Sequence, residues 1–580
     1  NWFSGKFNMA HPELELLEEH EKNLRSAMQP VYPSTEKLSN KGITNRVVSK
    51  IMQQLFIETN GKFTETLSDN LRSELKLINK DSALFNVHFP KNQELLSKAQ
   101  FRLKFEELFY IQLQLIIKNL IHKSKIKGFP FDQVGIHFNS FFKDHLPFEL
   151  TNAQKRVLKE IRADLGSNAQ MNRLLQGDVG SGKTIVAFMS ILMALDNGFQ
   201  ACLMAPTEIL SVQHYNGLFE WCNKLKISIK ILTGSTKTSS RRIIHESLEN
   251  GELQILIGTH ALLEDKVKFK NLGLAIIDEQ HRFGVKQRSK LWQKNSLPPH
   301  VLVMTATPIP RTLAMSVYGD LDISIIDELP PGRKAIKTVH RYDKNRLKVF
   351  RFIRDEIDKG RQIYIVYPLI QENEKMDYKD LMDGYESISR DFPMPKYQTS
   401  IVHGKMKPAD KDYEMQRFIK GETQIMVATT VIEVGVNVPN ASVMIIESAE
   451  RFGLSQLHQL RGRVGRGAEQ SYCILMTSHK LSSNSKTRLE TMVRTNDGFE
   501  IAEVDLRLRG PGDIMGTQQS GVLNLKIADI IKDNDILQLA RHHAKSILKI
   551  DPALALSENQ VFLNTYKQLG KYKNIWNYIS

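Results

Sequence analysis

Short apolar runs alternate with longer, mixed segments from about residue 146 onward. Runs of this kind are typical of strands buried on both faces, and the segments between them are long enough for helices. The runs lie at 203–205, 255–257, 274–277 and 301–304, and after an interruption at 362–367, 424–428 and 443–447. The alternation predicts parallel sheets with crossover helices.

The interruption at 329–333 reads LPPGR. Its prolines have no backbone N–H to donate to a strand ladder, and they stiffen the chain. We therefore predict two α/β domains joined by a stiff linker.

Helical patterns flank the α/β region on both sides. Between about residues 42 and 127 apolar residues recur at steps of three or four, which is a helical spacing. The clearest stripe comprises Phe101, Phe105, Phe109, Leu113, Ile116 and Leu120. We predict a helix packed on a neighbouring domain. After about residue 479 the strand pattern stops, and a polar sequence with a helical pattern follows, which contains a glycine-rich stretch at 507–521.

The composition indicates a folded, basic protein of several domains. The chain has 580 residues, and a typical domain has about 100–200. Lys and Arg number 79 against 64 Asp and Glu, which gives a net charge of +15, and 41% of residues are hydrophobic. That apolar content excludes a disordered chain. The positive charge fits a polyanionic partner such as nucleic acid, and equally a solvated surface.

Cysteine usage and hydropathy exclude several classes. Cys202, Cys222 and Cys473 are too few and too scattered for a disulfide framework or a four-ligand zinc site, as expected in a reducing compartment. No run approaches the roughly 18 apolar residues of a membrane span, and residues 1–7 lack the features of a signal peptide. We predict a protein that is neither exported nor inserted in a membrane.

The segment 177–184 reads GDVGSGKT and fits the pattern G-x-x-x-x-G-K-[ST]. A strand-like stretch precedes it and a helix-like stretch at 185–195 follows, as the pattern requires. Glycines let the backbone N–H groups of such a loop surround phosphate oxygens, while the lysine reaches the β and γ phosphates and the hydroxyl ligates Mg²⁺. The predicted ATP-binding residues of the loop are Gly177, Gly180, Ser181, Gly182, Lys183 and Thr184.

An acidic pair ends the apolar run at 274–277. We expect Asp278 to hold Mg²⁺ through water, and Glu279 to orient and deprotonate the attacking water. A carboxylate pair after a strand is common, but together with the loop at 177–184 it predicts hydrolysis of ATP.

Three further segments, read in order, carry a family resemblance. Residues 278–281 read DEQH, 304–308 read MTATP and 459–466 read QLRGRVGR, which is similar to the motif set of superfamily 2 helicases. The chain more closely resembles RecG-type ATP-dependent DNA helicases, because 174–182 reads LLQGDVGSG, 258–262 GTHAL, 278–285 DEQHRFGV and 507–513 RLRGPGD. The resemblance runs from about residue 9 to the C-terminus.

The resemblance implies an α/β fold with two RecA-like P-loop motor domains. The expected limits are 1–33 for the end of an OB-fold wedge domain, 34–140 for a helical linker segment, 141–330 for the ATP-binding motor domain, 331–479 for the second motor domain and 480–580 for a translocation hairpin and helical tail. Because residues 2–7 read WFSGKF, like a strand and turn entered midway, and the chain starts with Asn, we expect the beginning of the wedge to precede residue 1.

The resemblance also assigns residues to the nucleotide. Phe148 would lie against adenine and Gln154 would read its edge; without the resemblance, the segment fits a helix cap formed with Thr151. Arg463 and Arg466, expected near the start of a helix, would reach the γ-phosphate from the second motor domain. A basic, solvated helix end is the alternative.

Small and hydroxyl residues would grip the DNA backbone, which positions a duplex without reading its sequence. By resemblance these are Pro206, Thr207, Thr233, Gly234, Thr259 and His260 in the first motor domain and His403, Thr429 and Thr430 in the second. Taken alone, each site fits an ordinary strand-end loop.

The segment 497–521 resembles the translocation motif of the family, a helical hairpin and loop, with Arg507, Arg509 and Gln519 as its candidate coupling residues. Glycines at 510, 512 and 516 predict a sharp loop, and a purely structural turn is the alternative. Two residues depart from the family pattern. Asn437 replaces an aspartate, which removes a charge but keeps hydrogen bonding, and Gln518 replaces a common arginine.

The function implied is that of an ATP-driven double-stranded DNA translocase that reverses forks and migrates Holliday junctions in recombination and repair. ATP and Mg²⁺ would be its cofactors and branched DNA its partner, with single-strand-binding protein as a further partner and no membrane contact. The family also implies a monomer in the bacterial cytoplasm, associated with the nucleoid.

Three other classes of protein share part of this motif pattern. A transcription-repair coupling factor shares the motor, but VHFP at 87–90 looks RecG-like. A DEAD-box RNA helicase would have Ser-Ala-Thr where 305–307 reads TAT. A nucleotide-binding scaffold without turnover would not need Glu279, Arg463 and Arg466 together.

Overall fold

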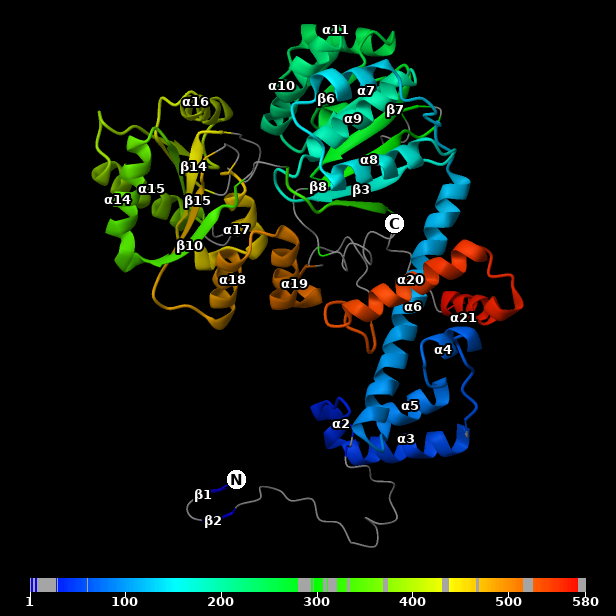
Figure 1. Cartoon of the computed structure of the whole chain (residues 1–580). Helices are drawn as coiled ribbons and strands as arrows, with labels where there is room; N and C mark the ends of the chain where they lie inside the picture. The colour runs from blue at the N-terminus through cyan, green and yellow to red at the C-terminus, as the bar shows by residue number, and fades with distance from the viewer. Residues whose placement is uncertain are drawn as a thin grey trace. The chain divides into compact units, whose positions relative to one another are not determined.

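The computed structural model describes most of the chain and divides it into two compact units. The described residues are 2–3, 6–7, 28, 30–59, 61–279, 294–295, 297–305, 310, 321–330, 334–368, 374–429, 438–465, 469–514 and 525–571. One unit comprises 1–117 with 518–579, and the other comprises 118–517. Figure 1 labels their elements.

The first sheet of the larger unit has seven strands, all paired in parallel, in the order β5-β6-β4-β7-β8-β3-β9. In chain order they are β3 (Asn172–Gly177), β4 (Gln200–Met204), β5 (Ile229–Leu232), β6 (Ile255–Gly258), β7 (Leu272–Asp278), β8 (His300–Thr305) and β9 (Asp322–Ile326). The helices around it are α7 (Ile136–Ser140), α8 (Asn152–Leu165), α9 (Lys183–Asp196), α10 (Glu208–Lys224) and α11 (Thr238–Glu249).

Alternate residues of the strands fill two cores, one on each face of this sheet. Leu203 and Ile276 pack in the core that contains α8, α9 and part of α10, whereas Cys202 and Ile277 pack in the core beneath α11. Such two-sided burial explains why the central strands read as continuous apolar runs. Helix α9 is apolar along its whole length for the same reason, because every residue from Ile185 to Leu195 is buried.

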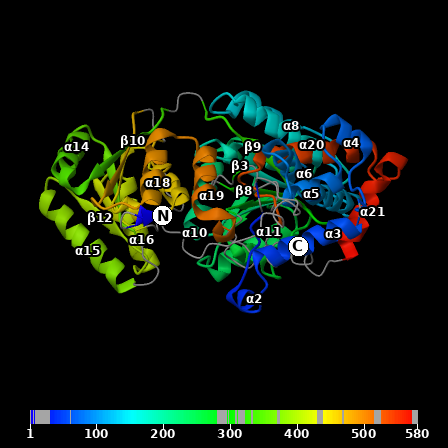
Figure 2. The ribbon, with the colours of Figure 1, turned by 90° about the horizontal axis from the view of Figure 1, so that it is seen from below.

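The second sheet has six parallel strands in the order β10-β15-β14-β11-β13-β12. They are β10 (Lys337–Tyr342), β11 (Gln362–Val366), β12 (Thr399–Val402), β13 (Ile425–Ala428), β14 (Ala441–Ile446) and β15 (Tyr472–Thr477). Helices α14 (Arg346–Asp358) and α15 (Glu374–Asp391) cover one face, and α16 (Pro408–Ile419), α17 (Leu454–Arg461) and α18 (Ser483–Arg494) the other (Figure 2).

The predicted fold class and the apolar strands are confirmed, while five strands lay outside the prediction. These are β5, β9, β10, β12 and β15. Four of them, β5, β9, β10 and β12, are edge strands, so within the described part of the chain one side of each pairs with no other strand. Edge strands carry more polar residues, as in KTVHRY of β10, and a search for continuous apolar runs therefore does not detect them.

Two helices follow the second sheet as a hairpin, α18 and α19 (Gly498–Ile514). The sharp loop predicted at glycines 510 and 512 is wrong, because α19 continues through both of them; residue 516 lies outside the described part. The apolar residues Ile501, Val504 and Leu508 pack on the core of the second sheet. Burial of this stripe stabilises the helix against the low helical propensity of glycine and proline.

The smaller unit is helical. It contains α2 (Glu36–Asn40), α3 (Asn45–Thr59), α4 (Asp69–Glu74), α5 (Lys80–His88), most of α6 (Gln93–Lys125), α20 (Asn534–Ile550) and α21 (Gln560–Lys571). Strand β1 (Trp2–Phe3) pairs antiparallel with β2 (Lys6–Phe7); the two residues between them lie outside the described part, so the predicted turn stays a prediction.

The predicted apolar stripe lies on α6, and the C-terminal helices α20 and α21 pack against it. Phe105 and Phe109 are fully buried together with apolar residues of α20 and α21. The rings of Phe109 and Phe562 are 5.2 Å apart between centroids. Helices separated by more than 400 residues of sequence therefore share one core.

A carboxylate on α6 receives the chain as it enters the C-terminal helices. Glu107 accepts hydrogen bonds from the backbone N–H groups of Lys526 (2.6 Å), Ile527 (3.1 Å) and Ala528 (2.9 Å). One turn earlier Lys104 pairs with Asp533 at 2.8 Å. These contacts attach the residues after 524 to α6.

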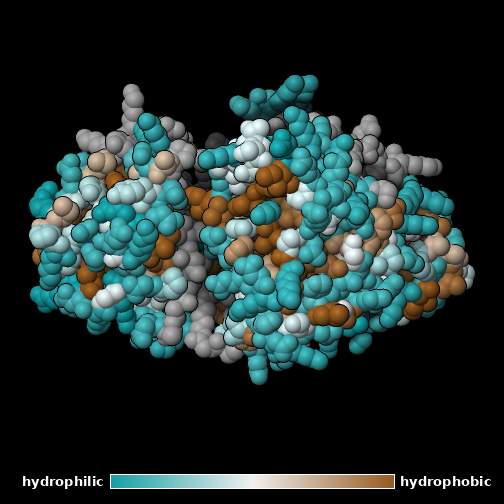
Figure 3. All heavy atoms as spheres, turned by 90° about the horizontal axis from the view of Figure 1, so that it is seen from above, coloured by the Kyte–Doolittle hydropathy of each residue, from teal (hydrophilic) through white to brown (hydrophobic). Residues whose placement is uncertain are grey.

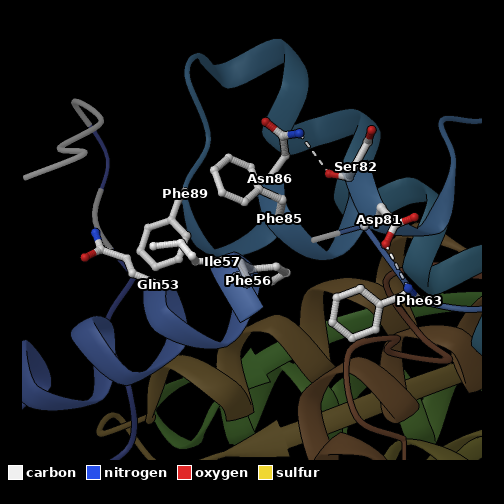
Figure 4. A pocket seen from close by; sticks show the side chains of 10 residues that line it. Gln53, Phe56, Ile57, Phe63, Asp81, Ser82, Phe85, Asn86 and Phe89 are labelled. Atoms are coloured by element: carbon white, nitrogen blue, oxygen red, sulfur yellow. Dashed lines mark hydrogen bonds between the residues drawn. The ribbon is translucent and has the colours of Figure 1, made fainter. Parts of the chain in front are cut away.

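The smaller unit also has an aromatic pocket of about 470 Å³. Figure 4 shows Phe56 of α3 beside Phe85 and Phe89, with Asn86 and Ser82 at the polar side. The rings of Phe56 and Phe85 meet edge to face, 5.5 Å apart. Aromatic packing therefore holds α3 on α5 while leaving an opening between them.

The surface is mainly hydrophilic on the face shown in Figure 3, with apolar patches between hydrophilic residues. Among the residues that the structure describes, we find no helix with the length and apolar content that crossing a bilayer would need.

Glu107→Ala should loosen the C-terminal helices, because three backbone donors lose their acceptor and two of them, Ile527 and Ala528, are partly buried, at roughly 1–3 kcal/mol for a buried unsatisfied group. We expect faster amide hydrogen exchange at 526–528 and through α20, measured by mass spectrometry. Glu94→Ala is the matched control on the same helix, since Glu94 is 71% exposed and pairs with Lys98. Equal exchange in both variants would contradict the anchoring role.

Candidate active site

The loop between β3 and α9 depends on glycines for its shape. Gly180 and Gly182 have φ of +78° and +85°, in the left-handed region that side chains rarely adopt. A Cβ on Gly182 would lie 2.2 Å from Nε2 of Gln154, and one on Gly177 would lie 2.5 Å from Oγ of Ser181. The two ends of the loop therefore pack closely against each other and against Gln154 of α8, and the loop leads directly into α9.

The residues present fit a nucleotide phosphate. The Ser181 hydroxyl is buried and has no hydrogen-bond partner among the described residues. The Lys183 ammonium donates to the carbonyls of Gly177 (2.7 Å) and Asp178 (2.9 Å), so it lies over the loop. Thr184 follows in the first turn of α9, where N–H groups and the helix dipole favour an anion. A buried hydroxyl, a cation and the N-terminal end of a helix together suit phosphate oxygens.

Gln154 holds the loop from α8. Its amide accepts from the Thr151 N–H at 3.0 Å and donates to the Ser181 carbonyl at 2.8 Å, while Thr151 caps the helix. The cap that the residues alone predicted is therefore confirmed. Phe148 packs, half-buried, on the core of the first sheet. The adenine contacts of Phe148 and Gln154 stay predictions.

Asp278 ends β7 and has a partner that the sequence did not reveal. Its Oδ2 is 2.8 Å from Nε2 of His214 on α10, and both side chains are largely buried. Strand β8 lies between β7 and β3, so Asp278 and the phosphate loop lie at the same carboxyl edge of the sheet, two strand spacings or about 10 Å apart. No local motif marks His214, because only the fold brings α10 beside β7.

Glu279 is held in an unusual backbone conformation. Its φ is +54°, its N–H donates to the Met304 carbonyl at 2.9 Å, and its Oε2 accepts from the Thr305 hydroxyl at 3.4 Å. A residue other than glycine keeps this left-handed backbone conformation only when surrounding contacts stabilise it. Thr305, which the sequence placed in a motif without a role, therefore orients Glu279.

Helix α17 of the second sheet contacts the phosphate loop directly. A Cβ on Gly462 would lie 2.9 Å from Cβ of Val179, and His458 Nε2 is 2.6 Å from Asp178 Oδ1. Burial opposes ionisation of Asp178, but hydrogen bonds from His458 and the Val179 N–H, with the Lys183 charge, hold its pKa below the usual value.

The helix-start position predicted for the arginine pair is wrong for Arg463. Its N–H donates to the Leu460 carbonyl in the turn after α17 ends at Arg461. Gly465, with φ of +78°, continues that turn away from the helix. Arg463 thus directly follows the glycine that touches the loop. Arg466 lies outside the described residues.

The predicted DNA-gripping residues of the first motor domain come together at one sheet edge. Strands β4, β6 and β5 are neighbours, and the residues follow their carboxyl ends: Pro206 and Thr207 after β4, Thr233 and Gly234 after β5, Thr259 and His260 after β6. The Glu208 carboxylate joins two of these loops by accepting from the Ser235 N–H at 3.0 Å and from its hydroxyl at 3.1 Å.

Three threonine hydroxyls of these loops lie inside the protein or bond to its own backbone. Thr207 Oγ1 caps α10, and Thr233 and Thr259 are 5% and 2% exposed. Backbone groups and the exposed His260 are therefore the atoms best placed for an external phosphate.

In the second domain, His403 and Thr429 follow the neighbouring strands β12 and β13. Burial, with the charges of Lys411 and Lys405, lowers the pKa of His403. Arg507 is exposed on α19 and lies 3.8 Å from Glu503. Arg509 falls on the same helix, while Thr430, Asn437, Gln518 and Gln519 lie outside the described residues.

Family models match three parts of the chain. Residues 151–316 match the DEAD/DEAH box helicases, 347–468 the helicase conserved C-terminal domain, and 495–580 the model described as ATP-dependent DNA helicase RecG, domain 3, C-terminal.

Similar proteins carry the name ATP-dependent DNA helicase RecG. The one from Synechocystis sp. is 48% identical over 95% of this chain and 66% of its own length, and the one from Bacillus subtilis is 45% identical over 90% and 76%. A solved structure of RecG bound to a three-way DNA junction matches with a TM-score of 0.64 and 42% identity, covering 88% of this chain and 66% of that one. The chain thus spans about two thirds of the length of the Synechocystis protein.

Gly182→Ala should disrupt the loop, because a left-handed alanine costs roughly 1–2 kcal/mol and its Cβ would also collide with Gln154. We expect at least a tenfold loss of affinity for a fluorescent ATP analogue. Gly198→Ala is the matched control, since Gly198 has φ of +78° with nothing within 4 Å of a Cβ. Equal loss of affinity in both variants would show that the collision is irrelevant.

Proposed function

This chain belongs to the RecG family of ATP-dependent DNA helicases, and from that premise we propose that it is an ATP-driven translocase on double-stranded DNA. Its substrates are forks and Holliday junctions, which it remodels in recombination and repair. The observation that carries the proposal is the contact of α17 with the phosphate loop, through Val179 and Gly462. It supports a site built from both motor domains, as hydrolysis that drives movement requires.

In this proposal the first motor domain binds ATP and prepares the water. Lys183 neutralises the β and γ phosphates, and Thr184 with Asp278 holds Mg²⁺. Bound Mg²⁺ would neutralise charge that develops on the transferred phosphate. Glu279, which Thr305 contacts at 3.4 Å, accepts the proton of the attacking water. His214 keeps Asp278 oriented through its 2.8 Å contact.

The second motor domain completes the site. Arg463 stands in the turn next to Gly462, and Arg466 follows it; both stabilise negative charge on the γ-phosphate. Such arginines contribute about 10³–10⁵ in rate. Because they are on the other domain, their engagement closes the cleft and phosphate release reopens it.

The loops after β4, β5, β6, β12 and β13 form the proposed track for the DNA backbone. Their backbone N–H groups and small side chains position phosphates and read no sequence. The hairpin α18–α19, with Arg507, Arg509 and Gln519, couples cleft closure to movement along the duplex. The match of 495–580 to a RecG-specific model supports this over an RNA helicase.

The remaining assignments follow the family. The proposed domain limits are 1–33, 34–140, 141–330, 331–479 and 480–580, with an OB-fold wedge that separates strands at the junction. We infer a monomer that works on the bacterial nucleoid, with single-strand-binding protein as an additional partner.

Glu279→Gln should slow turnover strongly, since the amide keeps the size but cannot take a proton; general bases contribute about 10²–10⁴ in rate. We expect kcat to fall by a factor in that range, measured in steady-state assays with forked DNA, linear duplex, single strands and RNA. Glu246→Gln, on the surface of α11 and 68% exposed, is the control. Stimulation of the wild type by RNA alone would refute the assignment.

DNA affinity should depend steeply on salt if phosphate contacts dominate, with log K falling by about 0.9 per contacted phosphate per log unit of salt. Arg507→Ala should reduce that slope by about one contact, measured by fluorescence anisotropy. Lys359→Ala is the control, because Lys359 precedes β11 and lies at the opposite sheet edge. A flat salt response would argue against the proposed track.

A further inference from the structure

The edge strand β10 presents one row of backbone groups that no strand satisfies. The Lys337 N–H donates to the Ser471 carbonyl, on the side of β15, at 3.0 Å. Successive residues of a strand bond to opposite sides, so every second residue from Lys337 onward bonds to β15. The N–H and C=O groups of Thr338, His340 and Tyr342 therefore point away from the sheet. Among the strands that the structure describes, none pairs with this side.

Helix α18 forms a wall beside this edge. Figure 1 and Figure 2 both show α18 next to β10, and a groove of about 490 Å³ lies between them. Its lining includes Val339, His340 and Arg341 of the strand with Leu489 and Val493 of the helix. Leu489 is buried, whereas Val493 is 44% exposed. Unpaired backbone groups beside an apolar helix are the arrangement that binds peptides by strand addition.

The two faces of β10 differ in chemistry. Thr338 lies on the face covered by α17 and α18, since the Arg461 guanidinium donates to its hydroxyl at 3.4 Å. Lys337 and Arg341 lie on the opposite face; both are exposed and neither belongs to an ion pair among the described residues. A strand added at this edge would continue the alternation. Every second side chain would lie against α18, and the others beside the two cations.

The charge around the groove favours an acidic segment. Strand β10 and helix α18 together have five cations and one carboxylate, a net charge of +4 with histidine neutral. The carboxylate, Glu490, is 3.9 Å from Lys486, and Arg494 is paired with Glu500. The two cations of β10 have no such partner. Carboxylates on a bound segment would supply the complementary charge.

The same charges argue against a second copy of this chain. Charged residues keep the sheet edges of identical molecules apart, and Arg341 adds to this protection by donating to the outward carbonyl of His340 at 2.9 Å. In a pair of chains joined at β10, Lys337 and Arg341 would meet their own copies. Like charges directly opposite each other destabilise strand pairing, whereas a segment of opposite charge is attracted.

We propose that the groove between β10 and α18 binds an extended segment of another protein in which apolar and acidic residues alternate. The segment adds a strand to the outward backbone groups of β10. Its apolar side chains contact Val493, and its carboxylates pair with Lys337 and Arg341. The proposal goes beyond the function proposed above, and the binding requires neither ATP nor DNA.

The test measures the fluorescence anisotropy of fluorescein-labelled peptides added to the whole chain. One peptide alternates valine with glutamate, a second has the same residues as a valine block followed by a glutamate block, and a third alternates valine with lysine. The first should bind at least about tenfold more tightly than the others, because only it places apolar and acidic side chains on opposite faces. Its binding should also slow amide hydrogen exchange at 338–342, measured by mass spectrometry.

Two variants test the two faces. Val493→Asp should weaken binding of the valine–glutamate peptide about tenfold, since loss of an apolar contact of this size changes the dissociation constant by roughly that factor. Val212→Asp on α10 is the matched control, because Val212 is also 44% exposed. Lys337→Glu, at an exposed site, should reverse the preference in favour of the valine–lysine peptide.

Equal binding of the alternating and block peptides would overturn the proposal. Equal losses in Val493→Asp and Val212→Asp, an unchanged preference in Lys337→Glu, or unchanged amide exchange at 338–342 would do the same. A groove that served the DNA backbone instead would lose duplex affinity in Lys337→Glu and show no peptide preference, which would also refute it. Thermal unfolding identifies any variant that fails to fold, in which case the peptide comparison on the wild type decides alone.

Discussion

Parallel strand pairing is the constraint on which the rest of the larger unit depends. Every strand pair in its two sheets is parallel, so all strands of a sheet end at one edge. The phosphate loop, Asp278, Glu279 and the candidate DNA loops all follow strand ends, and this shared edge collects them. Strand order then separates them: the predicted nucleotide-binding residues follow β3, β8 and β7, and the loops predicted to contact the DNA backbone follow β4, β6 and β5.

Helix α17 brings residues of the second sheet's domain to the phosphate loop. It brings Gly462 against Val179 and places Arg463 in the adjoining turn, so residues of the second sheet reach a site formed by the first. The same helix contacts α19 through Ser455 and, through Arg461, the end of α18. One short helix therefore contacts both the phosphate loop and the hairpin α18–α19, to which we assign the coupling role in the proposed function.

The smaller unit relies on packing between distant parts of the chain. The stripe of α6 is covered by α20 and α21, and Glu107 holds the entry to them through three backbone N–H groups. Burial of apolar residues, most of them aliphatic, stabilises this core, while the carboxylate specifies where the returning chain attaches. A single long helix thus organises segments from both ends of the sequence.

The sequence by itself determined the fold class, the central strands, the phosphate loop and the acidic pair, because their signals are local: continuous apolar runs, a glycine-lysine spacing, carboxylates at a strand end. Only the tertiary structure decided the edge strands, the partner of the α6 stripe and the length of α19. It also brought His214 to Asp278, Thr305 to Glu279 and His458 to Asp178. Those contacts join residues 26 to 280 positions apart, and no local pattern encodes a distance that arises only when the strands are ordered and packed.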